Sequence, residues 1–194
     1  MRGRASRIGL TGGIGSGKST FGAVLQKRGA ALVDSDQIAR QVTGPGGAAI
    51  AAIAHRFGPE FVDDTGALDR GRMRELAYST PEARTALEAI VHPLVSLHSS
   101  QQAQAAEDAG TRVIVFDVPL LVESGRWVQR LDTVIVIDCP PALQIQRVMS
   151  RSGLNRSTVE AILAAQSPRN IRRASADIVV HNGDNCTLAD LHKM

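Results

Sequence analysis

The sequence predicts an α/β protein built on a doubly wound, parallel, five-stranded sheet. Five short runs rich in Val and Ile lack alternating polar residues, which is typical of strands covered on both faces. Longer segments with helical periodicity separate these runs, as expected where helices connect parallel strands. The predicted strands cover residues 7–10, 31–34, 112–116, 132–138 and 178–180.

Helical segments follow these strands along the chain. The first begins after a glycine-rich turn, and the second begins at an Asp-Ser-Asp sequence that can cap a helix. The stretch between the second and third strands exceeds a normal crossover of one helix, so we expect a helical insertion at about residues 46–109 that contacts a substrate. The predicted helices cover residues 18–28, 35–41, 48–57, 70–78, 81–109, 141–151, 157–166 and 169–173.

The composition excludes several classes of protein. The chain has 194 residues, of which 43% are hydrophobic and 21% charged, so we expect one folded core rather than a disordered or fibrous chain. Its longest apolar runs fall far short of the roughly 20 residues that span a bilayer. The arginines near the N-terminus are followed too soon by Thr-Gly-Gly for a signal peptide. We therefore expect a cytoplasmic protein with no membrane partner and with Cys139 and Cys186 as free thiols.

The basic residues are concentrated in one segment. The formal net charge is +3, yet residues 147–173 hold six arginines and a single acid, Glu160. A local surplus of positive charge indicates an anionic ligand more than a generally basic surface.

The most informative motif follows the first predicted strand directly. Residues 12–19, GGIGSGKS, match the phosphate-binding loop (P-loop) pattern and precede the first helix. Glycines let backbone N–H groups turn toward phosphate oxygens, Lys18 supplies charge to the β- and γ-phosphates, and Ser19 offers a hydroxyl to Mg²⁺. The residues predicted to bind the nucleotide here are Gly13, Ile14, Gly15, Ser16, Gly17, Lys18, Ser19 and Thr20.

Further residues narrow the class of nucleotide-binding protein. The chain has no Asn-Lys pair, which the NKxD guanine motif requires, and it is too short for the added domains of a large ATPase. A small-molecule kinase that uses ATP and Mg²⁺ remains. Asp36 follows the second strand, whose carboxyl end faces the ligand crevice of such a sheet, so Asp36 is the predicted general base. Asp34 and Asp36 can alternatively serve as helix caps.

Dispersed sequence blocks resemble the dephospho-CoA kinase family. The resemblance runs from residue 8 to about residue 185, with every block in the family's order. The blocks are LTGGIGSGKST at 10–20, VDSD at 33–36, ARQV at 39–42, HPL at 92–94, VPLLVE at 118–123, AAQ at 164–166, AD at 176–177 and NG at 182–183.

The resemblance implies a fold and an activity. The activity is ATP-dependent phosphorylation of the ribose 3′-hydroxyl of dephospho-CoA, the last step of coenzyme A synthesis. The fold is a single P-loop nucleotide kinase domain with a core at residues 1–45, 110–150 and 174–194, the helical substrate-binding insertion at about 46–109 and a lid at about 151–173. We expect a monomer or weak homo-oligomer.

The resemblance also implies roles for individual residues. Asp36 matches the proposed base, and Lys18 and Ser19 match the loop lysine and the Mg²⁺-side hydroxyl. Asp117 ends the third strand like a Walker B acid, and a metal role and a substrate-side role both stay open. The residues assigned to the acceptor side are Thr11, Asp36, His92, Pro119, Leu120, Leu121 and Glu123.

Several of these residues have plainer alternatives. His92 before Pro93 can be a structural residue at a helix end, Leu120 and Leu121 can be core or cleft wall, and Glu123 can be a surface acid. In the implied lid region, Arg147 and Arg169 are assigned to ATP, Arg147 with a catalytic role, and a solvated helix face is the alternative. Asn182 and Gly183 are assigned to the adenine edge or to a plain turn. The arginines expected on solvated faces are Arg151, Arg156, Arg172 and Arg173.

Two rival functions can be weighed against a dephospho-CoA kinase. A kinase for a nucleoside or nucleoside monophosphate would use arginines of the insertion, which offers Arg56, Arg70, Arg72, Arg74 and Arg84. A nucleic-acid-binding protein would use the basic segment, but single-strand binding usually adds stacking aromatic residues, and only 3% of this chain is aromatic. We therefore expect no nucleic-acid partner.

Overall fold

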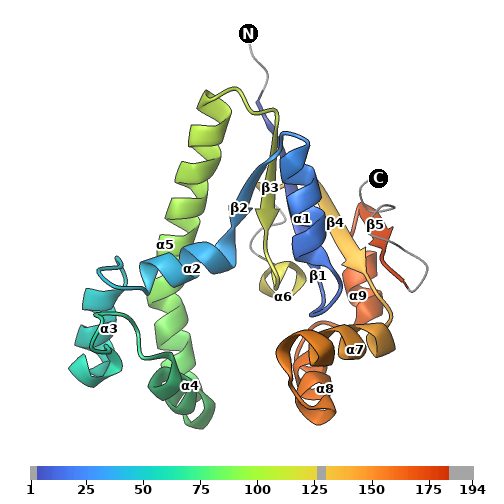
Figure 1. Cartoon of the computed structure of the whole chain (residues 1–194). Coiled ribbons are helices and arrows are strands. Elements are labelled where there is room, and N and C mark those ends of the chain that lie inside the picture. The colour runs from blue at the N-terminus through green and yellow to red at the C-terminus, as the bar shows by residue number, and fades with distance from the viewer. Residues whose placement is uncertain (1–3, 126–129, 184–194) are drawn as a thin grey trace. The chain divides into compact units, whose positions relative to one another are not determined.

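The structure is a computed structural model that describes residues 4–125 and 130–183 (Figure 1). The chain divides into two compact units, each described by itself below. The first unit comprises residues 1–33 and 105–194, and the second comprises residues 34–104.

A five-stranded sheet forms the centre of the first unit. The strand order is β2-β3-β1-β4-β5, and β1 pairs in parallel with both β3 and β4, while β4 pairs in parallel with β5. The predicted doubly wound α/β sheet is therefore confirmed. The strands are β1 (Ser6–Gly12), β2 (Ala31–Asp34), β3 (Val113–Asp117), β4 (Thr133–Asp138) and β5 (Ile178–His181).

The register brings the chemically active strand ends together. Leu10 of β1 is paired with Asp117 of β3, and Gly12 is paired with Ile137 of β4. Asp138, the next residue of β4, is paired with His181 of β5. Because parallel strands end at the same edge of a sheet, the glycine-rich loop, Asp117 and Asp138 share that edge.

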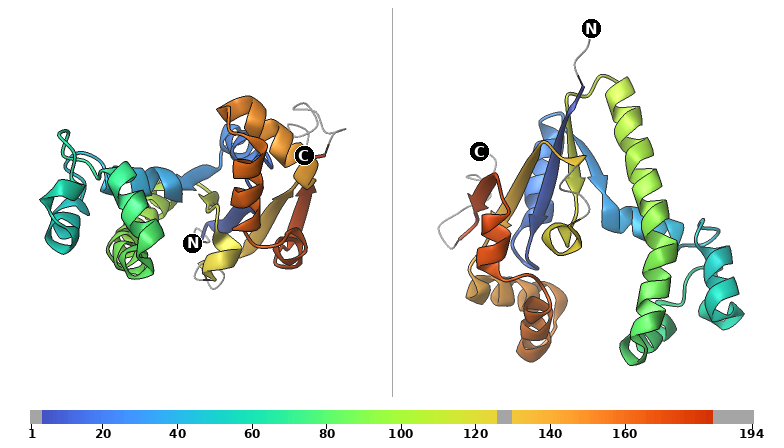
Figure 2. Two further views of the ribbon diagram at one scale, coloured as in Figure 1. Left: turned by 90° about the horizontal axis from the view of Figure 1, so that it is seen from below. Right: turned by 180° about the vertical axis from the view of Figure 1, so that it is seen from behind.

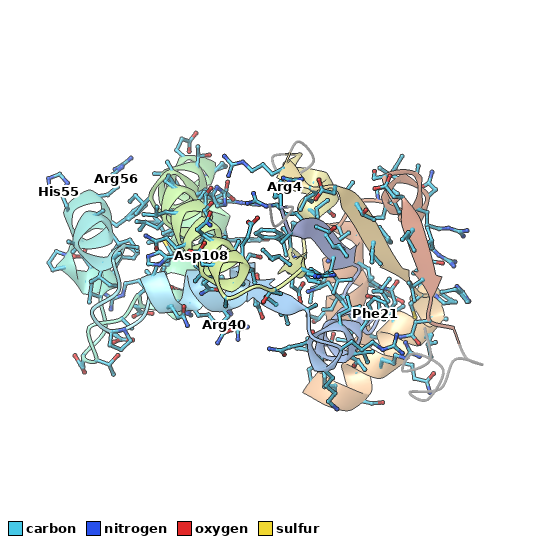
Figure 3. All side chains as sticks on the ribbon, turned by 90° about the horizontal axis from the view of Figure 1, so that it is seen from above. Arg4, Phe21, Arg40, His55, Arg56 and Asp108 are labelled. Atoms are coloured by element: carbon cyan, nitrogen blue, oxygen red, sulfur yellow. The ribbon has the colours of Figure 1, made fainter. Side chains whose placement is uncertain are left out.

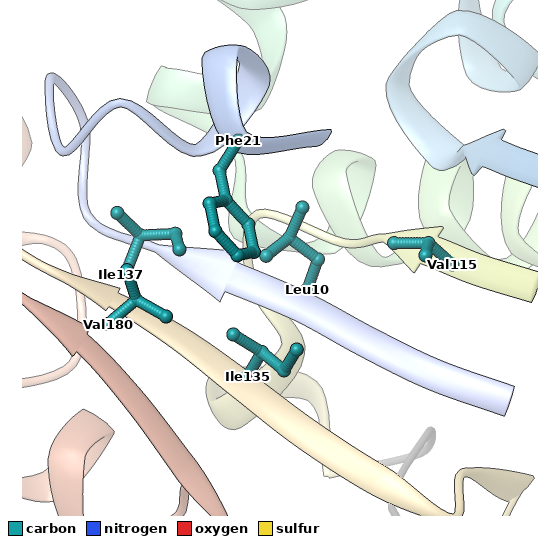
Figure 4. Packing of buried hydrophobic residues seen from close by; sticks show 6 residues of the cluster. All are labelled: Leu10, Phe21, Val115, Ile135, Ile137 and Val180. Atoms are coloured by element: carbon teal, nitrogen blue, oxygen red, sulfur yellow. The ribbon is translucent and has the colours of Figure 1, made fainter. Parts of the chain in front are cut away.

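Helix α1 (Lys18–Lys27) packs on the sheet directly after the loop. Its Phe21 points onto the strands beside Leu10 and Ile137, all nearly inaccessible to solvent (Figure 4). This packing anchors the loop at both ends, because the strand before it and the helix after it belong to one core. The buried members of the cluster are Leu10, Phe21, Val115, Ile135, Ile137 and Val180.

The remaining helices of this unit follow β3 and β4. Figures 1 and 2 show α1 on one face of the sheet and α9 on the other. Helices α7 and α8 pack through Ile145, Val148 and Val159, and Ile14 of the loop packs against this small cluster. The helices are α6 (Leu121–Ser124), α7 (Pro141–Ser152), α8 (Arg156–Ala164) and α9 (Arg169–Ala174).

The second unit is largely helical and has its own core. Ile53 of α3 and Met73 of α4 pack there with Phe61, and Val62 and Leu68 form an isolated antiparallel bridge. Arg40, His55 and Arg56 are exposed on its surface (Figure 3). Its helices are α2 (Ser35–Val42), α3 (Ile50–Phe57), the 3-10 helix η1 (Pro59–Phe61), α4 (Arg70–Ser79) and α5 (Pro81–Asp108), the last of which continues into the first unit.

The predicted elements differ from the observed ones mainly where the elements are short. Every predicted strand and helix is present, with ends shifted by a few residues. The helix α6 and the 3-10 helix η1 were not predicted, because three or four residues are too few to show a helical period. Across the described residues, no helix combines the length and apolar character needed to cross a membrane.

Candidate active site

The glycine-rich loop has the backbone conformation that its glycines permit. Gly15 has φ of 72° and Gly17, which caps α1, has φ of 94°. Both values lie in the left-handed region that disfavours other residues. Space is also short, since a Cβ atom on Gly15 would lie 2.7 Å from the Gln144 carbonyl oxygen. The glycines therefore let the loop turn tightly at the head of α1.

Three side chains brace the loop from other elements. Gln144 donates from Nε2 to the carbonyl oxygen of Ile14 at 2.6 Å, and Gln166 Oε1 accepts the Ile14 N–H at 3.0 Å. Asn182 donates from Nδ2 to the Ser16 carbonyl oxygen at 2.7 Å. The loop conformation is thus held by α7, by the turn before α9 and by the end of β5.

Two of these braces were only partly predicted. Asn182 had been expected at the adenine edge or in a plain turn, and it is buried against the loop, while Gly183 is buried beside it. Gln144 was missed, because a single glutamine in a helix gives no sequence signal for its burial. Gln166 stands in the AAQ block, which had carried the resemblance but no assigned contact.

Lys18 forms an ion pair with Asp117 at the edge of the sheet. Both side chains are largely buried, with 15% of Lys18 and 6% of Asp117 exposed. The pairing of Asp117 with Leu10 in the sheet register places its carboxylate beside the loop lysine. Asp117 is therefore tied to the phosphate loop, and its expected part in metal binding stays a prediction.

Arg147 contacts the end of β5. Its guanidinium donates to the carbonyl oxygen of Asn182 at 3.3 Å, to Asn182 Oδ1 at 3.4 Å and to Cys139 Sγ at 3.5 Å. The alternative of a solvated helix face is wrong for this residue, because its nitrogens are used inside the fold. Arg147 holds Asn182, which in turn donates to the carbonyl oxygen of Ser16. A direct contact between Arg147 and ATP stays a prediction.

Arg169 forms a bidentate pair with Asp138. Its Nε and Nη2 atoms each lie 2.7 Å from a carboxylate oxygen of Asp138. His181 Nδ1 lies 3.3 Å from the same carboxylate, and Arg173 Nη1 lies 3.9 Å from it. The hydrogen bond from Arg169 chiefly lowers the pKa of Asp138 to about 2, and the same bond raises the pKa of Arg169. This cluster fastens α9 to the ends of β4 and β5.

Arg172 contradicts the expectation of a solvated helix face. Only 7% of the residue is exposed, and Nη1 donates to the carbonyl oxygen of Ser167. The absence of a side chain on Gly13 makes room for it, since a Cβ there would lie 2.9 Å from Nη2. Burial lowers the pKa of Arg172. A helix of six residues is too short for its sequence period to reveal the buried face.

The acceptor-side residues of the first unit are Thr11 of β1 and residues of the segment before and within α6. Thr11 is fully buried and its hydroxyl donates to the Pro119 carbonyl oxygen at 3.1 Å. Leu121 is buried, as the core alternative predicted, whereas Leu120 is 44% exposed. Glu123 accepts the Ser167 N–H at 2.7 Å, so its carboxylate has a structural partner in the turn before α9.

The other predicted residues lie in the second unit. Asp34 caps α2 by accepting the Gln37 N–H at 2.9 Å, as its alternative role predicted, and Asp36 is exposed in the first turn of that helix. His92 is half-buried and lies in the middle of α5, because the helix continues through Pro93. The alternative that His92 ends a helix is therefore wrong.

Oxygen donors for a cation are available at the loop. Ser19 is exposed in the first turn of α1, Thr20 follows it, and the Asp117 carboxylate lies at the adjoining strand end. Within the described ranges, no group of three or more His, Cys, Asp or Glu residues could hold a metal ion by itself. This donor set fits Mg²⁺, which protein groups usually hold together with substrate phosphates and water.

Known proteins match nearly the whole chain in sequence. The family model for dephospho-CoA kinase matches residues 6–187. The dephospho-CoA kinase of Albidiferax ferrireducens is 54% identical over 191 residues, which cover 98% of this chain and 89% of that protein. The dephospho-CoA kinase of Bordetella pertussis is 51% identical over 184 residues, which cover 95% of this chain and 84% of that protein.

Solved structures match the fold. A crystal structure of a Thermus thermophilus protein has a TM-score of 0.84 at 35% identity and covers 97% of this chain and 93% of its own. Dephospho-CoA kinase from Campylobacter jejuni has a TM-score of 0.70 at 26% identity, with coverage of 96% and 92%. A shikimate kinase from Bacteroides thetaiotaomicron has a TM-score of 0.52 at 18% identity, with coverage of 97% and 94%. The likeness to shikimate kinase shows the fold alone. Together the three structures confirm the predicted fold of the P-loop kinase type.

Proposed function

Because the chain belongs to the dephospho-CoA kinase family, we propose that it transfers the terminal phosphoryl group of ATP to the ribose 3′-hydroxyl of dephospho-CoA. The products are coenzyme A and ADP. The observation that supports this most strongly is the braced P-loop, with Lys18 at the head of α1 and Asp117 beside it, in a chain matched by the family over residues 6–187.

The loop backbone binds the phosphates of ATP. Left-handed glycines and the start of α1 present N–H groups and a partial positive charge to phosphate oxygens. Lys18 exchanges its contact with Asp117 for the β- and γ-phosphates, so its charge neutralises the group being transferred. Because Gln144, Gln166 and Asn182 already hold the loop, little reorganisation accompanies nucleotide binding.

The hydroxyl of Ser19 and the carboxylate of Asp117 are the groups that would hold Mg²⁺ together with the phosphates. The bound ion supplies positive charge that stabilises the phosphate oxygens. Ser19 is suited to this contact because it is exposed in the first turn of α1. Asp117 is suited to it because its carboxylate lies at the strand end beside the loop lysine.

Asp36 accepts the proton of the ribose 3′-hydroxyl as the oxygen attacks the γ-phosphorus. The new bond joins that oxygen to phosphorus, the bond between phosphorus and the β–γ bridging oxygen breaks, and ADP leaves with the electron pair. The carboxylate is free of capping duty, because Asp34 supplies the cap of α2. A base of this kind contributes about 10²- to 10⁴-fold to the rate.

The acceptor is positioned by the segment before and within α6, and His92 is a further acceptor-side residue. The 44% exposed side chain of Leu120 offers an apolar contact, while buried Thr11 fixes the backbone at Pro119. Glu123 joins this segment to the turn before α9 through Ser167. The acceptor side and the arginine-bearing helix are therefore mechanically connected.

The test is ADP formation by the purified chain with ATP, Mg²⁺ and a panel of acceptors. Dephospho-CoA, AMP, CMP and adenosine are compared at equal concentration. Of the four acceptors, we expect only dephospho-CoA to give ADP formation above the background of ATP hydrolysis. Selective turnover of AMP or CMP would assign the protein to nucleoside monophosphate kinases instead.

A further inference from the structure

The glycines of the loop leave the direction of its peptide groups open. Gly15 has φ of 72° and Gly17 has φ of 94°, and glycine adopts positive and negative φ about equally well. The peptide group that leads into each of these glycines can therefore turn over. The carbonyl oxygen would then take the place of the N–H group. Because a phosphate is attracted by N–H groups and repelled by carbonyl oxygens, the loop binds it with the peptides in one direction only.

Gln144 of α7 holds the first of these peptide groups by its carbonyl oxygen. Its Nε2 donates to the Ile14 carbonyl oxygen at 2.6 Å, and only 1% of the residue is exposed. In a trans peptide, the carbonyl oxygen of one residue and the N–H of the next lie in one plane and point in opposite directions. By holding the Ile14 oxygen, Gln144 therefore fixes the direction of the Gly15 N–H.

Asn182 acts on the second peptide group in the same way. Its Nδ2 donates to the Ser16 carbonyl oxygen at 2.7 Å, which fixes the direction of the Gly17 N–H. Arg147 donates to Asn182 Oδ1 at 3.4 Å, so the oxygen of the amide is turned to the arginine and the nitrogen to the loop. Asn182 is buried, and burial shields its hydrogen bond from competing water.

The glycines of the motif make room for both amides. A Cβ atom on Gly17 would overlap Asn182 Nδ2, and a Cβ atom on Gly13 would lie 2.5 Å from Gln144 Nε2. A side chain at either position would therefore displace the amide that holds the loop. The glycine spacing and the two amides depend on one another.

Gln166 contacts the same loop residue but fixes a different group. Its Oε1 accepts the Ile14 N–H at 3.0 Å, so it fixes the direction of the Gly13 carbonyl oxygen. That oxygen also accepts the Ser16 N–H at 3.0 Å. Gln166 therefore repeats a restraint that the loop backbone supplies. In contrast, Gln144 is the one donor to the Ile14 carbonyl oxygen among the described residues.

We propose that Gln144 and Asn182 are positioning residues, which keep the N–H groups of the two left-handed glycines directed at the phosphates of the bound nucleotide. This role rests on the proposed kinase function and deepens it. Both residues act through the loop backbone, and the donating NH₂ group of each amide is the part that is required.

The experiment compares Gln144→Met with Gln166→Met by calorimetric titration of ATP and adenosine in the presence of Mg²⁺. Methionine is similar in length to glutamine, lacks the donor and adds no charge that would repel ATP. We expect Gln144→Met to weaken ATP binding about tenfold, as for the loss of one buried hydrogen bond, and to leave adenosine binding unchanged. Gln166→Met should weaken ATP binding by about threefold at most. Gln146→Met, at an exposed position of α7, is the matched control and should bind both ligands like the wild type.

The comparison of the two glutamines decides between peptide direction and general stiffening of the loop. Equal losses of ATP affinity in Gln144→Met and Gln166→Met would overturn the proposal, because stiffening would then explain both. An ATP dissociation constant of Gln144→Met within about twofold of the wild type would also overturn it. Equal losses for ATP and adenosine in this variant would do the same.

Asn182→Ala tests the second peptide group, and it decides the proposal if Gln144→Met does not fold. Circular dichroism and thermal unfolding without nucleotide show whether each variant is folded. We expect Asn182→Ala to weaken ATP binding about tenfold and to leave adenosine binding unchanged. A contact between Asn182 and the adenine ring would weaken the binding of ATP and adenosine alike, and that result would contradict the positioning role.

The wild-type chain keeps this proposal distinct from the function on which it rests. A wild-type chain that binds no ATP, or forms no ADP with dephospho-CoA, refutes the proposed function. A wild-type chain that does both, while Gln144→Met and Gln166→Met behave alike, refutes the positioning role alone.

Discussion

Lys18 and Arg172 both present a positive charge at the phosphate loop, but the fold compensates these charges differently. Lys18 has its own carboxylate in Asp117, at a strand end that the sheet register fixes. Arg172 lies on α9, a helix with three arginines and no acidic residue. The carboxylate of Asp138 is bound by Arg169, and Arg172 donates to the Ser167 carbonyl oxygen. The comparison teaches that two cations at one loop can be held differently: Lys18 is paired with a carboxylate, whereas Arg172 donates to a backbone carbonyl oxygen.

The largest expected effect comes from removing the paired cation. Lys18→Ala should lower turnover by about 10³- to 10⁵-fold, because the transferred group loses the charge that neutralises it. The measurement is steady-state ADP formation with dephospho-CoA. Lys27→Ala, at the exposed end of the same helix, is the control and should keep wild-type activity. Activity of Lys18→Ala within tenfold of the wild type would remove Lys18 from the mechanism.

Loss of Lys18 also removes the ion pair that it forms with the buried carboxylate of Asp117, which can destabilise the fold. Circular dichroism therefore accompanies the assay, and the double variant Lys18→Met with Asp117→Asn provides a neutral pair of similar size. An inactive but folded double variant would show that the lost activity does not arise from unfolding.

A substitution in the second unit tests whether ATP binding and phosphoryl transfer depend on different residues. Asp36→Asn should lower the turnover number by about 10²- to 10⁴-fold while the ATP dissociation constant stays unchanged, because Asp36 acts on the acceptor proton. Single-turnover kinetics and calorimetry measure the two quantities. Asp34→Asn is the control, since asparagine caps a helix as well as aspartate does. A fall in ATP affinity with an unchanged rate at saturation would make Asp36 a nucleotide-side or metal-side residue.

The ion pairs that Asp138 of β4 forms with Arg169 and Arg173 of α9 should affect stability more than ATP affinity. Asp138→Asn should lower the free energy of unfolding by about 2 kcal/mol at neutral pH, because the pKa of this buried carboxyl is lowered to about 2 from 3.8 in the native state.

The pH dependence of this effect has a definite direction. A lowered native pKa contributes stability that is complete above pH 3.8 and is lost as the pH falls toward 2. Urea unfolding at several pH values should therefore show the wild type and Asp138→Asn converging in stability below pH 3.8. Asp64→Asn, at an exposed position, should follow the wild type throughout. A difference between wild type and Asp138→Asn that stays constant down to pH 2 would contradict the assignment.

Local patterns made most of the fold and the loop predictable from the sequence. Uninterrupted apolar runs marked the strands, and the glycine spacing before Lys18 marked the P-loop, because both signals lie within a few consecutive residues. The partners of the loop were not predictable in this way. Gln144 and Arg172 reach it from helices more than 100 positions away, and their burial depends on tertiary packing that a helical period does not report.

The most direct test of the kinase assignment is phosphorus NMR of the material formed from ATP and dephospho-CoA by the wild-type chain. The account predicts a new phosphomonoester on the ribose 3′-oxygen in an amount equal to the ADP produced, and neither product with Lys18→Ala. ADP accompanied only by inorganic phosphate, or a phosphate on another oxygen of the acceptor, would contradict it.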